Sequence, residues 1–455
     1  MRIILITLCL VLAVPAAAKS VVHEYRLENG MKVIVKEDRR APIVVSQVWY
    51  KVGSSYEPAG ITGISHVLEH MMFKGTKAHP PGEFSRIVAA NGGSENAFTG
   101  RDYTAYFQTV SNDRLEAMLE LEADRMRNLT LPEEEFLKEV EVVKEERRLR
   151  TEDNPMSLTY EQFSAVAYRS LPYANPIIGW MNDLNNLTVK DLRFWYRRWY
   201  APNNAILVVV GDVDPQSVLA MARRHFGPMQ AESLPELKPL REPSQRGEAR
   251  VKVRAPAKEP YLVFGYKTPN VGSADEDWEP YALEVLASVL DGGSSARFSR
   301  NLVRGSEVAV SAGAEYNAFS RLPGMLLVDG TPSPGHDLRQ LEQALRGQLE
   351  QLKEKPVDGQ ELDRIKAQVV ASKVYELDSV FYQAMQIGLL ETIGLDWRLA
   401  DRYVERIRQV TPEQVRAVAR KYINDENLTL AELEPLPLED RKVSANTQGA
   451  RNDLR

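Results

Sequence analysis

The stretch His66-Val67-Leu68-Glu69-His70 holds two of the six histidines in the sequence, spaced four residues apart. The pattern from Gly63 to Phe73 is helical, and residues four apart lie on one face of a helix, so both imidazoles can bind one metal ion. Glu69 lies beside them, where it can take a proton from a water acidified by zinc. The alternative is that these residues fall on an ordinary helix by chance. Because the sequence has so few histidines, their spacing favours a metal site.

A third metal ligand must come from elsewhere, because a catalytic zinc has three protein ligands and one open position. The acidic helix expected from 133 to 150 offers Glu139, Glu141, Glu145 and Glu146, most of which would ordinarily lie on a solvated face. Glu139 and Glu146 are two turns apart and share a face, whereas Glu145 points about 100° away from Glu146. One residue of this pair could bind the metal while the other supports a histidine.

Strand and helix patterns follow each other in both halves of the chain. They predict an α+β fold of two similar domains, each a mostly antiparallel sheet with helices packed on one face. The first domain, with the histidine motif, spans residues 19–229, and the second spans 251–436. The polar, proline-containing stretch 230–250 is the expected linker, and the polar tail 437–455 is expected to be disordered.

The two halves also share a weak sequence pattern. Glu284-Val285-Leu286-Ala287-Ser288 can be laid on the histidine motif, and Asn317-Ala318-Phe319 follows it at nearly the spacing of Asn96-Ala97-Phe98. Such a recurrence is typical of an internal duplication. If the halves are copies, the second has lost every metal-binding side chain.

Composition is that of a folded protein, with 44% hydrophobic and 26% charged residues among 455. This length favours two domains. The net charge of -6, without a clustered basic run, argues against nucleic acid or an anionic membrane as partner. After the N-terminal segment, no apolar stretch reaches the length of a bilayer span, so no membrane span is expected in the mature chain.

Residues 1–18 are expected to form a cleaved signal peptide. Arg2 precedes an apolar run from Ile3 to Val14, and the small residues Ala16-Ala17-Ala18 follow it. An uncleaved anchor is the alternative, but the run is short for a span. The single cysteine, Cys9, lies in this run, so the mature chain has no thiolate ligand and no disulfide. A signal peptide followed by a chain without cysteine predicts a periplasmic protein.

The histidine motif has the order of the inverzincin pattern, the reverse of the commoner zincin motif. With its flanking residues it resembles the zinc motif of the pitrilysin/insulinase family, close to the mitochondrial processing peptidase and the half-length bacterial members. The resemblance covers residues 22 to 435 and is specific in the first half. The matching stretches, in order, are His66-Val67-Leu68-Glu69-His70-Met71-Met72-Phe73-Lys74-Gly75-Thr76, Gly93-Ser94-Glu95-Asn96-Ala97-Phe98-Thr99, the glutamates Glu139 and Glu146, and Tyr200-Ala201-Pro202-Asn203-Asn204 through Gly211-Asp212.

This resemblance implies a zinc endopeptidase with one Zn²⁺ per chain. It assigns the metal to His66, His70 and Glu146, the general base to Glu69, and a supporting role to Glu139. A zinc-polarised carbonyl would be attacked by water activated by the glutamate, which then protonates the leaving amine.

The resemblance also places an extended peptide substrate along Asn96 and Ala97, where it would add a strand to the sheet. Without it, these two residues could equally be ordinary turn and strand residues.

Family members of twice this length enclose their substrate between two halves. The resemblance therefore implies that two chains close a chamber, either as a homodimer or as a heterodimer with a homologous chain that lacks the zinc motif. Such a partner contributes an Arg/Tyr pair that grips the substrate. In this chain Arg297, Arg300, Tyr316 and Arg321 are candidates for such a pair, but each could equally be an ordinary surface residue. The family also includes scaffold subunits without activity, which is the alternative function.

Overall fold

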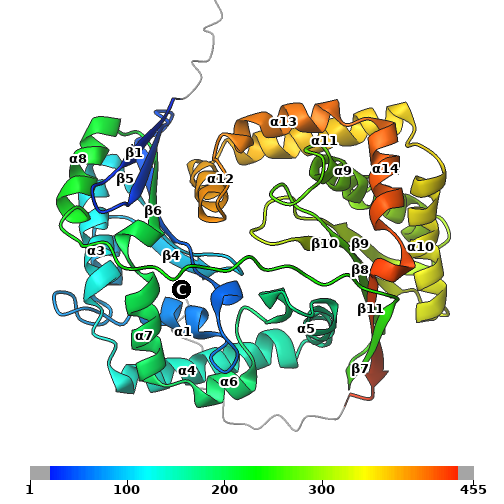
Figure 1. Ribbon diagram of the computed structural model, residues 1–455, viewed down its shortest axis with the longest axis horizontal. Coiled ribbons are helices and arrows are strands. Elements are labelled where there is room, and N and C mark those ends of the chain that lie inside the picture. Colours follow the sequence, from blue (N-terminus) through cyan, green and yellow to red (C-terminus); the bar gives the residue numbers. More distant parts are fainter. Residues whose placement is uncertain (1–20, 439–455) are drawn as a thin grey trace, which may run out of the picture.

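Two β-sheets organise the computed structural model, which describes residues 21–438, and each sheet forms the centre of one lobe (Figure 1). The first is six-stranded, in the order β1-β2-β6-β3-β5-β4. The second is five-stranded, in the order β7-β11-β8-β10-β9. The strands of the first sheet are β1 (Val22–Arg26), β2 (Lys32–Glu37), β3 (Ile43–Tyr50), β4 (Ser94–Thr99), β5 (Thr104–Ser111) and β6 (Ala205–Gly211). Those of the second are β7 (Ala249–Pro256), β8 (Tyr261–Thr268), β9 (Ala309–Glu315), β10 (Gly324–Pro332) and β11 (Leu428–Leu436).

The two sheets repeat one topology. Apart from β1, each strand of the first sheet has a counterpart at the same place in the second. In each sheet one pair is parallel, β2 with β6 and β7 with β11, and the remaining pairs are antiparallel. This recurrence supports an internal duplication and confirms the predicted α+β class with two mostly antiparallel sheets.

Helices cover these sheets. In the first half they are α1 (Ile64–Met71), α2 (Glu83–Ala90), α3 (Leu115–Asn128), α4 (Glu133–Arg147), α5 (Pro155–Ala167), α6 (Met181–Asn186), α7 (Val189–Trp199) and α8 (Pro215–His225). In the second half they are α9 (Glu279–Asp291), α10 (Leu338–Glu354), α11 (Gly359–Glu376), α12 (Val380–Thr392), α13 (Leu399–Gln409) and α14 (Pro412–Tyr422). None of the helices in residues 21–438 is long and apolar enough to cross a bilayer.

Most helices of each half pack on one face of their own sheet, but one helix from each half covers the opposite face of the other sheet (Figure 1). From the second half, α12 places Ala384 and Ile387 against Trp49 and its neighbours on the first sheet. From the first half, α5 places Phe163 and Ala167 against the second sheet. The exchange buries both faces of both sheets and ties the lobes together.

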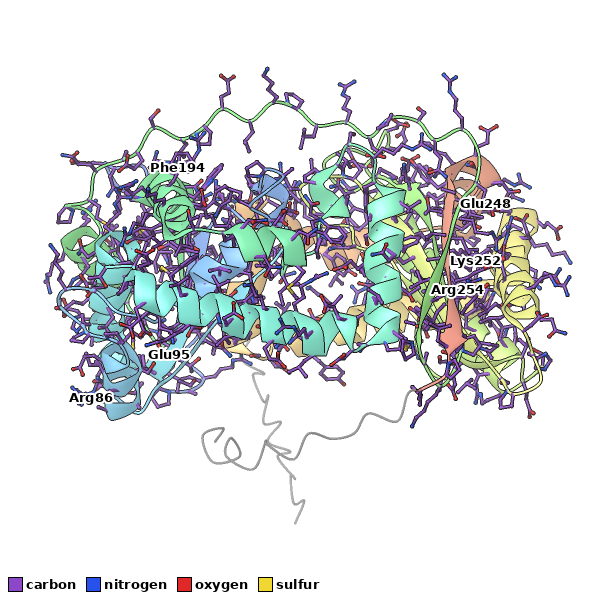
Figure 2. The ribbon with its side chains drawn as sticks, turned by 90° about the horizontal axis from the view of Figure 1, so that it is seen from below. Arg86, Glu95, Phe194, Glu248, Lys252 and Arg254 are labelled. Carbon is purple, nitrogen blue, oxygen red and sulfur yellow. The ribbon has the colours of Figure 1, made fainter. Side chains whose placement is uncertain are left out.

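Residues 230–248 form no helix or strand and run over one face of the molecule to Glu248, the residue before β7 (Figure 2). The expected domain boundaries and linker remain a prediction, because the exchanged helices cross any simple division of the chain. The expected signal peptide lies outside the described residues, as does the tail from residue 439.

The start of α1 depends on a close approach of two glycines. Gly63, the residue before α1, has φ +87°, and Gly179 opposite it has φ +86°. A Cβ added at Gly63 would lie 2.5 Å from the carbonyl oxygen of Ile178. Glycine is required here both for the left-handed backbone and for the space. The contact fixes the position of the helix that carries the histidine motif.

We predict that Gly63→Ala lowers the free energy of unfolding by about 1–3 kcal/mol more than Gly60→Ala, because it adds a steric collision. Gly60 is the matched control, since it has a similar φ of +94° and nothing within 4 Å of the added Cβ. Chemical denaturation of both variants gives the comparison. Equal destabilisation would show that the close approach is unimportant.

A buried carboxylate satisfies the first turn of α1. Glu57 accepts the backbone N–H of Gly63 (2.7 Å) on one oxygen and that of Ser65 (2.8 Å) on the other. Burial raises the pKa of Glu57 from 4.5 to about 7, although these hydrogen bonds oppose the shift. The folded protein therefore binds this proton more tightly than the unfolded chain.

This shift predicts a pH-dependent stability. The stabilisation that the Glu57 proton adds to the folded state is fully present below pH 4.5 and is lost as the pH rises through about 7. Glu57→Gln cannot titrate, so between pH 5 and pH 8 the unfolding free energy of the wild type should fall by about 1–3 kcal/mol relative to this variant. Urea unfolding at both pH values measures it, and a constant difference would contradict the expectation.

Candidate metal centre and cleft

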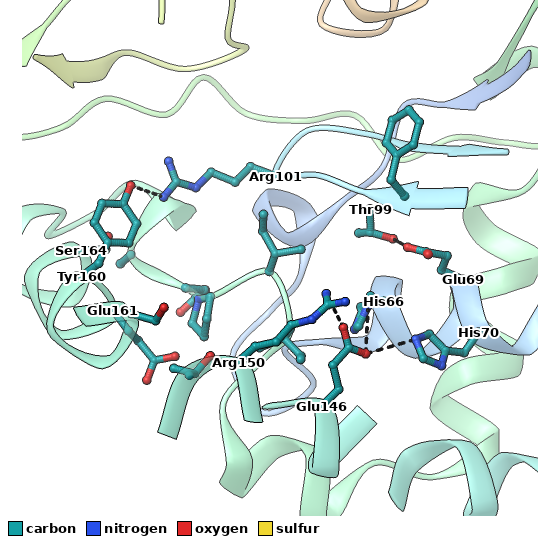
Figure 3. A pocket seen from close by; sticks show the side chains of 18 of the residues that line it. His66, Glu69, His70, Thr99, Arg101, Glu146, Arg150, Tyr160, Glu161 and Ser164 are labelled. Atoms are coloured by element: carbon teal, nitrogen blue, oxygen red, sulfur yellow. Dashed lines mark hydrogen bonds and ion pairs between the residues drawn. The ribbon is translucent and has the colours of Figure 1, made fainter. Parts of the chain in front are cut away.

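Two helices bring the sequence-predicted ligands together. His66 and His70 lie on one face of α1, and α4 packs against it with Glu146 pointing between them (Figure 3). Oε2 of Glu146 lies 3.5 Å from Nε2 of His70 and 3.9 Å from Nε2 of His66. One ligand atom from each residue lies within 4.8 Å of the others, which no other group of His, Cys, Asp or Glu in residues 21–438 achieves.

These three atoms fit a zinc ion. With zinc–ligand bonds of about 2.1 Å in a tetrahedron, neighbouring ligand atoms are about 3.4 Å apart, close to the separations seen here. Two imidazole nitrogens and one carboxylate form a donor set typical of catalytic zinc. With these three protein ligands, a bound zinc would keep its fourth position for water or substrate.

Glu139, two helical turns before Glu146, orients one of the histidines. Its Oε2 lies 3.2 Å from Nδ1 of His70, and its Oε1 pairs with Lys74 at 2.6 Å. A carboxylate on Nδ1 fixes the imidazole so that Nε2 faces the metal position. Glu139 therefore contacts His70 through Nδ1, whereas Nε2 of the same ring faces Glu146.

The other acidic residues of α4 lie away from the site. Glu141 is 66% exposed and pairs with Lys144, and Glu145 is 60% exposed and pairs with Arg148. Glu146 is held instead by Arg150, whose guanidinium lies 2.5 Å from Oε1 and leaves Oε2 to face the histidines. Of the four glutamates that the sequence left open, the geometry brings only Glu139 and Glu146 to the histidines.

The imidazoles differ in their electrostatics. Burial, together with the neighbouring His70, lowers the pKa of His66. Burial also disfavours the charged form of His70, but its hydrogen bonds to Glu139 and Glu146 outweigh this and raise its pKa. The same carboxylates that favour a proton on His70 would favour a divalent cation at this position.

Glu69 faces the cleft beside the histidines (Figure 3). Thr99 on the edge strand β4 donates a hydrogen bond from its hydroxyl to Oε2 of Glu69, at 2.5 Å. Burial raises the pKa of Glu69, against the effect of this hydrogen bond. A carboxylate with a raised pKa and one free oxygen is a stronger base than an exposed one.

Asn96 and Ala97 lie on β4, which forms one edge of the first sheet and, among the strands of residues 21–438, pairs with β5 alone. The backbone N–H of Ala97 is bonded to the side-chain oxygen of Asn96 at 2.8 Å. An extended chain that paired with Ala97 would replace this contact.

A cleft of about 880 Å³ joins these residues. It is lined by the histidine motif and β4 on one side, by Arg150 and α5 on another, and by Tyr261 of the second lobe. A cavity of this size can hold several residues of an extended peptide.

In the second half, the position of the histidine motif is occupied by Glu284 and Ser288 on α9. Glu284 is partly buried and accepts a hydrogen bond from the hydroxyl of Tyr403. Neither residue belongs to a group of potential metal ligands among the described residues.

The candidates for the substrate-gripping pair have internal partners. Arg297 pairs with Glu361 at 2.7 Å, Arg300 bonds the side chain of Asn301, and the Tyr316 hydroxyl donates to the carbonyl of Pro269. They are therefore engaged within the second lobe.

The fourth candidate, Arg321, binds across the lobes. It donates from its backbone N–H and Nε to Asp102 (3.1 and 3.2 Å), and its guanidinium bonds Ser55 and lies over the ring of Tyr56. Arg321 therefore holds the second lobe against the loop after β4.

Sequence reasoning missed three residues that hold the site. Thr99 lies two residues after Ala97, on the same side of a strand. Arg150 follows Glu146 by four residues, a spacing that brings side chains together on a helix. Strand and helix periodicity could have identified Thr99 and Arg150 once the ligands were chosen. Lys74 lies beyond the end of α1 and contacts Glu139 of α4, so no local spacing predicts it.

Known protein families match both halves of the chain. The family model described as "Insulinase (Peptidase family M16)" matches residues 32–180, and the "Peptidase M16 inactive domain" matches residues 186–369. The chain is 35% identical to the zinc protease PqqE of Helicobacter pylori over 78% of its own length and 79% of the relative's. It is 27% identical to the uncharacterized zinc protease YmxG of Bacillus subtilis, over 91% and 98% of the two chains.

Solved structures agree with this fold. A protease from Helicobacter pylori superposes with a TM-score of 0.87 at 31% identity, covering 92% of this chain and all of the other. The periplasmic protease PqqL of Escherichia coli has a TM-score of 0.76 at 18% identity, and the match covers 92% of this chain but only 48% of PqqL. The family predicted from the histidine motif is thereby confirmed, and the chain belongs to the M16 (insulinase) family of peptidases.

Proposed function

We propose that this chain is a zinc-dependent endopeptidase that cleaves extended peptides or unfolded protein segments. The observation that carries the proposal is the convergence of His66, His70 and Glu146 at a cleft, with Glu69 beside them. The names of relatives such as PqqE and YmxG, both zinc proteases, support it.

His66, His70 and Glu146 would hold one Zn²⁺, with Glu139 orienting His70. When bound, zinc acts as a Lewis acid that acidifies a water and polarises the scissile carbonyl. The donor set and the separations of the three ligand atoms support this assignment.

Glu69 acts as the proton carrier. Its free carboxylate oxygen takes a proton from the attacking water and then gives it to the nitrogen of the leaving amine. Thr99 holds the other oxygen, which orients the carboxylate toward the cleft. Its burial, which raises the pKa, strengthens the base before the transfer.

The substrate is an extended chain that adds to the free edge of β4. Main-chain hydrogen bonds at Ala97 give affinity for any sequence, and side-chain pockets along the cleft give preference. Asn96 releases the N–H of Ala97 as the peptide enters. The edge position of β4 and the cleft beside it support this mode.

Two chains would enclose the substrate in one chamber. This chain spans about half of PqqL, which suggests that a second, homologous chain provides the remainder. It is either a second copy or a relative without the zinc motif, and the internal partners of Arg297, Arg300, Tyr316 and Arg321 favour a relative that supplies the gripping pair in trans.

The chain would act in the periplasm after cleavage of residues 1–18. The length of the apolar run and its small-residue site support export, and PqqL is itself described as periplasmic. A scaffold or assembly subunit without activity is the alternative function. The presence of the complete ligand set with Glu69 favours the enzyme.

We expect Glu69→Gln to reduce kcat for peptide hydrolysis by about 10²–10⁴-fold while zinc remains bound, because the variant keeps the shape and loses the base. Fluorogenic peptides and zinc analysis measure the two quantities, with the purified chain alone and with a homologous partner. A zinc-loaded wild type that cleaves no peptide under either condition would support the scaffold alternative.

We further expect Glu139→Gln to weaken zinc binding by about 10–100-fold, since it removes the charge that orients His70. Glu141→Gln is the matched control on the same helix, because Glu141 is exposed and forms an ion pair with Lys144, away from the histidines. Competition with a chelator measures both affinities. Equal affinities for the two variants would remove Glu139 from the site.

A further inference from the structure

One end of the cleft is lined by an arginine without an acidic partner. Arg101 follows β4 in the turn to β5 and is partly buried. Its Nη2 donates to the hydroxyl of Tyr160 (3.3 Å), and its guanidinium lies over the ring of Tyr173. Within residues 21–438, no carboxylate lies within 4.0 Å of its guanidinium, whereas Arg147, Arg150 and Arg321 each pair with one.

The nearby carboxylates are engaged elsewhere. Asp102 is taken by Arg321, Ser55 and Tyr173, and Glu161 forms a two-point pair with Arg147. Glu315 lines a smaller cavity of about 120 Å³ that also touches Arg101, but it is exposed and makes no ion pair with the guanidinium. The positive charge of Arg101 is therefore left uncompensated at the cleft.

Two hydroxyl groups of α5 lie at the same end (Figure 3). Tyr160 and Ser164 are four residues apart and share one face of the helix. The Ser164 hydroxyl is buried without a hydrogen-bond partner in the described chain, and Tyr160 accepts from Arg101, which leaves its own hydrogen to donate. A buried hydroxyl without a partner costs free energy unless a ligand or water satisfies it.

From these groups we infer that Arg101, Tyr160 and Ser164 form a subsite for a carboxylate of the peptide substrate. A guanidinium binds both oxygens of a carboxylate at once, and two hydroxyl donors can complete its hydrogen bonds. Arg101 lies in the turn two residues beyond Thr99, at the end of the strand β4 that is proposed to carry the substrate. We therefore expect the carboxylate to belong to a residue that extends past the end of β4.

This inference rests on the proposed function, because it takes the cleft as the peptide site. The carboxylate has two possible sources: an acidic side chain, which gives a sequence preference, or the C-terminus, which gives cleavage at a fixed distance from the chain end. Both kinds of carboxylate would bind Arg101 in the same way, and peptides that carry only one kind distinguish them.

The experiment compares two sets of fluorogenic peptides on zinc-loaded protein. One set is amidated and carries Glu or Gln at each position in turn, and the other is neutral in its side chains, of graded length, with a free or amidated C-terminus. We expect one position or one length at which the carboxylate raises kcat/KM about tenfold. Arg101→Gln should abolish this preference, and Arg101→Lys should restore part of it.

Arg148→Gln is the matched control, because it removes one positive charge from an exposed residue outside the cleft. It should keep the preference. Binding of the same labelled peptides to the Glu69→Gln protein, with and without Arg101→Gln, tests the subsite even where hydrolysis fails.

The outcomes separate the two proposals. If no peptide is cleaved but the carboxylate preference in binding depends on Arg101, the peptidase proposal fails and the subsite stands. If peptides are cleaved and Arg101→Gln changes Glu and Gln peptides equally, or if no carboxylate preference exists, the subsite inference is wrong. The zinc content and the melting temperature of each variant show whether it is folded. If Arg101→Gln does not fold, Ser164→Ala tests the subsite instead, because it should reduce the preference for a carboxylate.

Discussion

The packing of α4 against α1 is the constraint on which the rest of the site depends. The two histidines share a face of one short helix, and two glutamates seven residues apart share a face of the other. When the helices pack, Glu139 meets Nδ1 of His70 and Glu146 meets the Nε2 atoms of both histidines. The acidic partners both create the negative potential for a cation and fix the imidazoles that would hold it.

The position of α1 depends in turn on features that lie outside the motif. Gly63 lets the chain approach Gly179 closely, and Glu57 satisfies the first turn of the helix from a buried position. Exchange of α5 and α12 between the lobes, with Arg321 bound to Asp102, holds the second lobe at the mouth of the cleft. One wall of the site is therefore built from the first half and another from the second.

Much of this arrangement could be predicted from sequence because it is periodic. The spacing of His66 and His70 on a helix, and of Glu139 and Glu146 two turns apart, is local information, and the family resemblance then selected Glu146 from the open candidates. The class of fold followed from the recurrence of strands and helices in both halves.

What could not be predicted depends on contacts between distant segments. Nothing in the local pattern of α5 or α12 shows that each covers the sheet of the other half, because an apolar helix face does not specify its partner. Arg321 looked like an ordinary surface or substrate-binding residue until its contact with Asp102, 219 residues away in sequence, was seen. The sequence could not show for the same reason that Arg101 has no carboxylate partner among residues 21–438, because the pairing of a charge depends on distant segments.

The central claim is that one zinc ion is held by His66, His70 and Glu146. It is tested most directly by a crystal structure of the zinc-loaded protein with diffraction data collected at the zinc absorption edge. The account predicts a single anomalous peak per chain, bonded to Nε2 of both histidines and to Glu146. A peak at another set of residues, or none at these three with zinc present in excess, would contradict it.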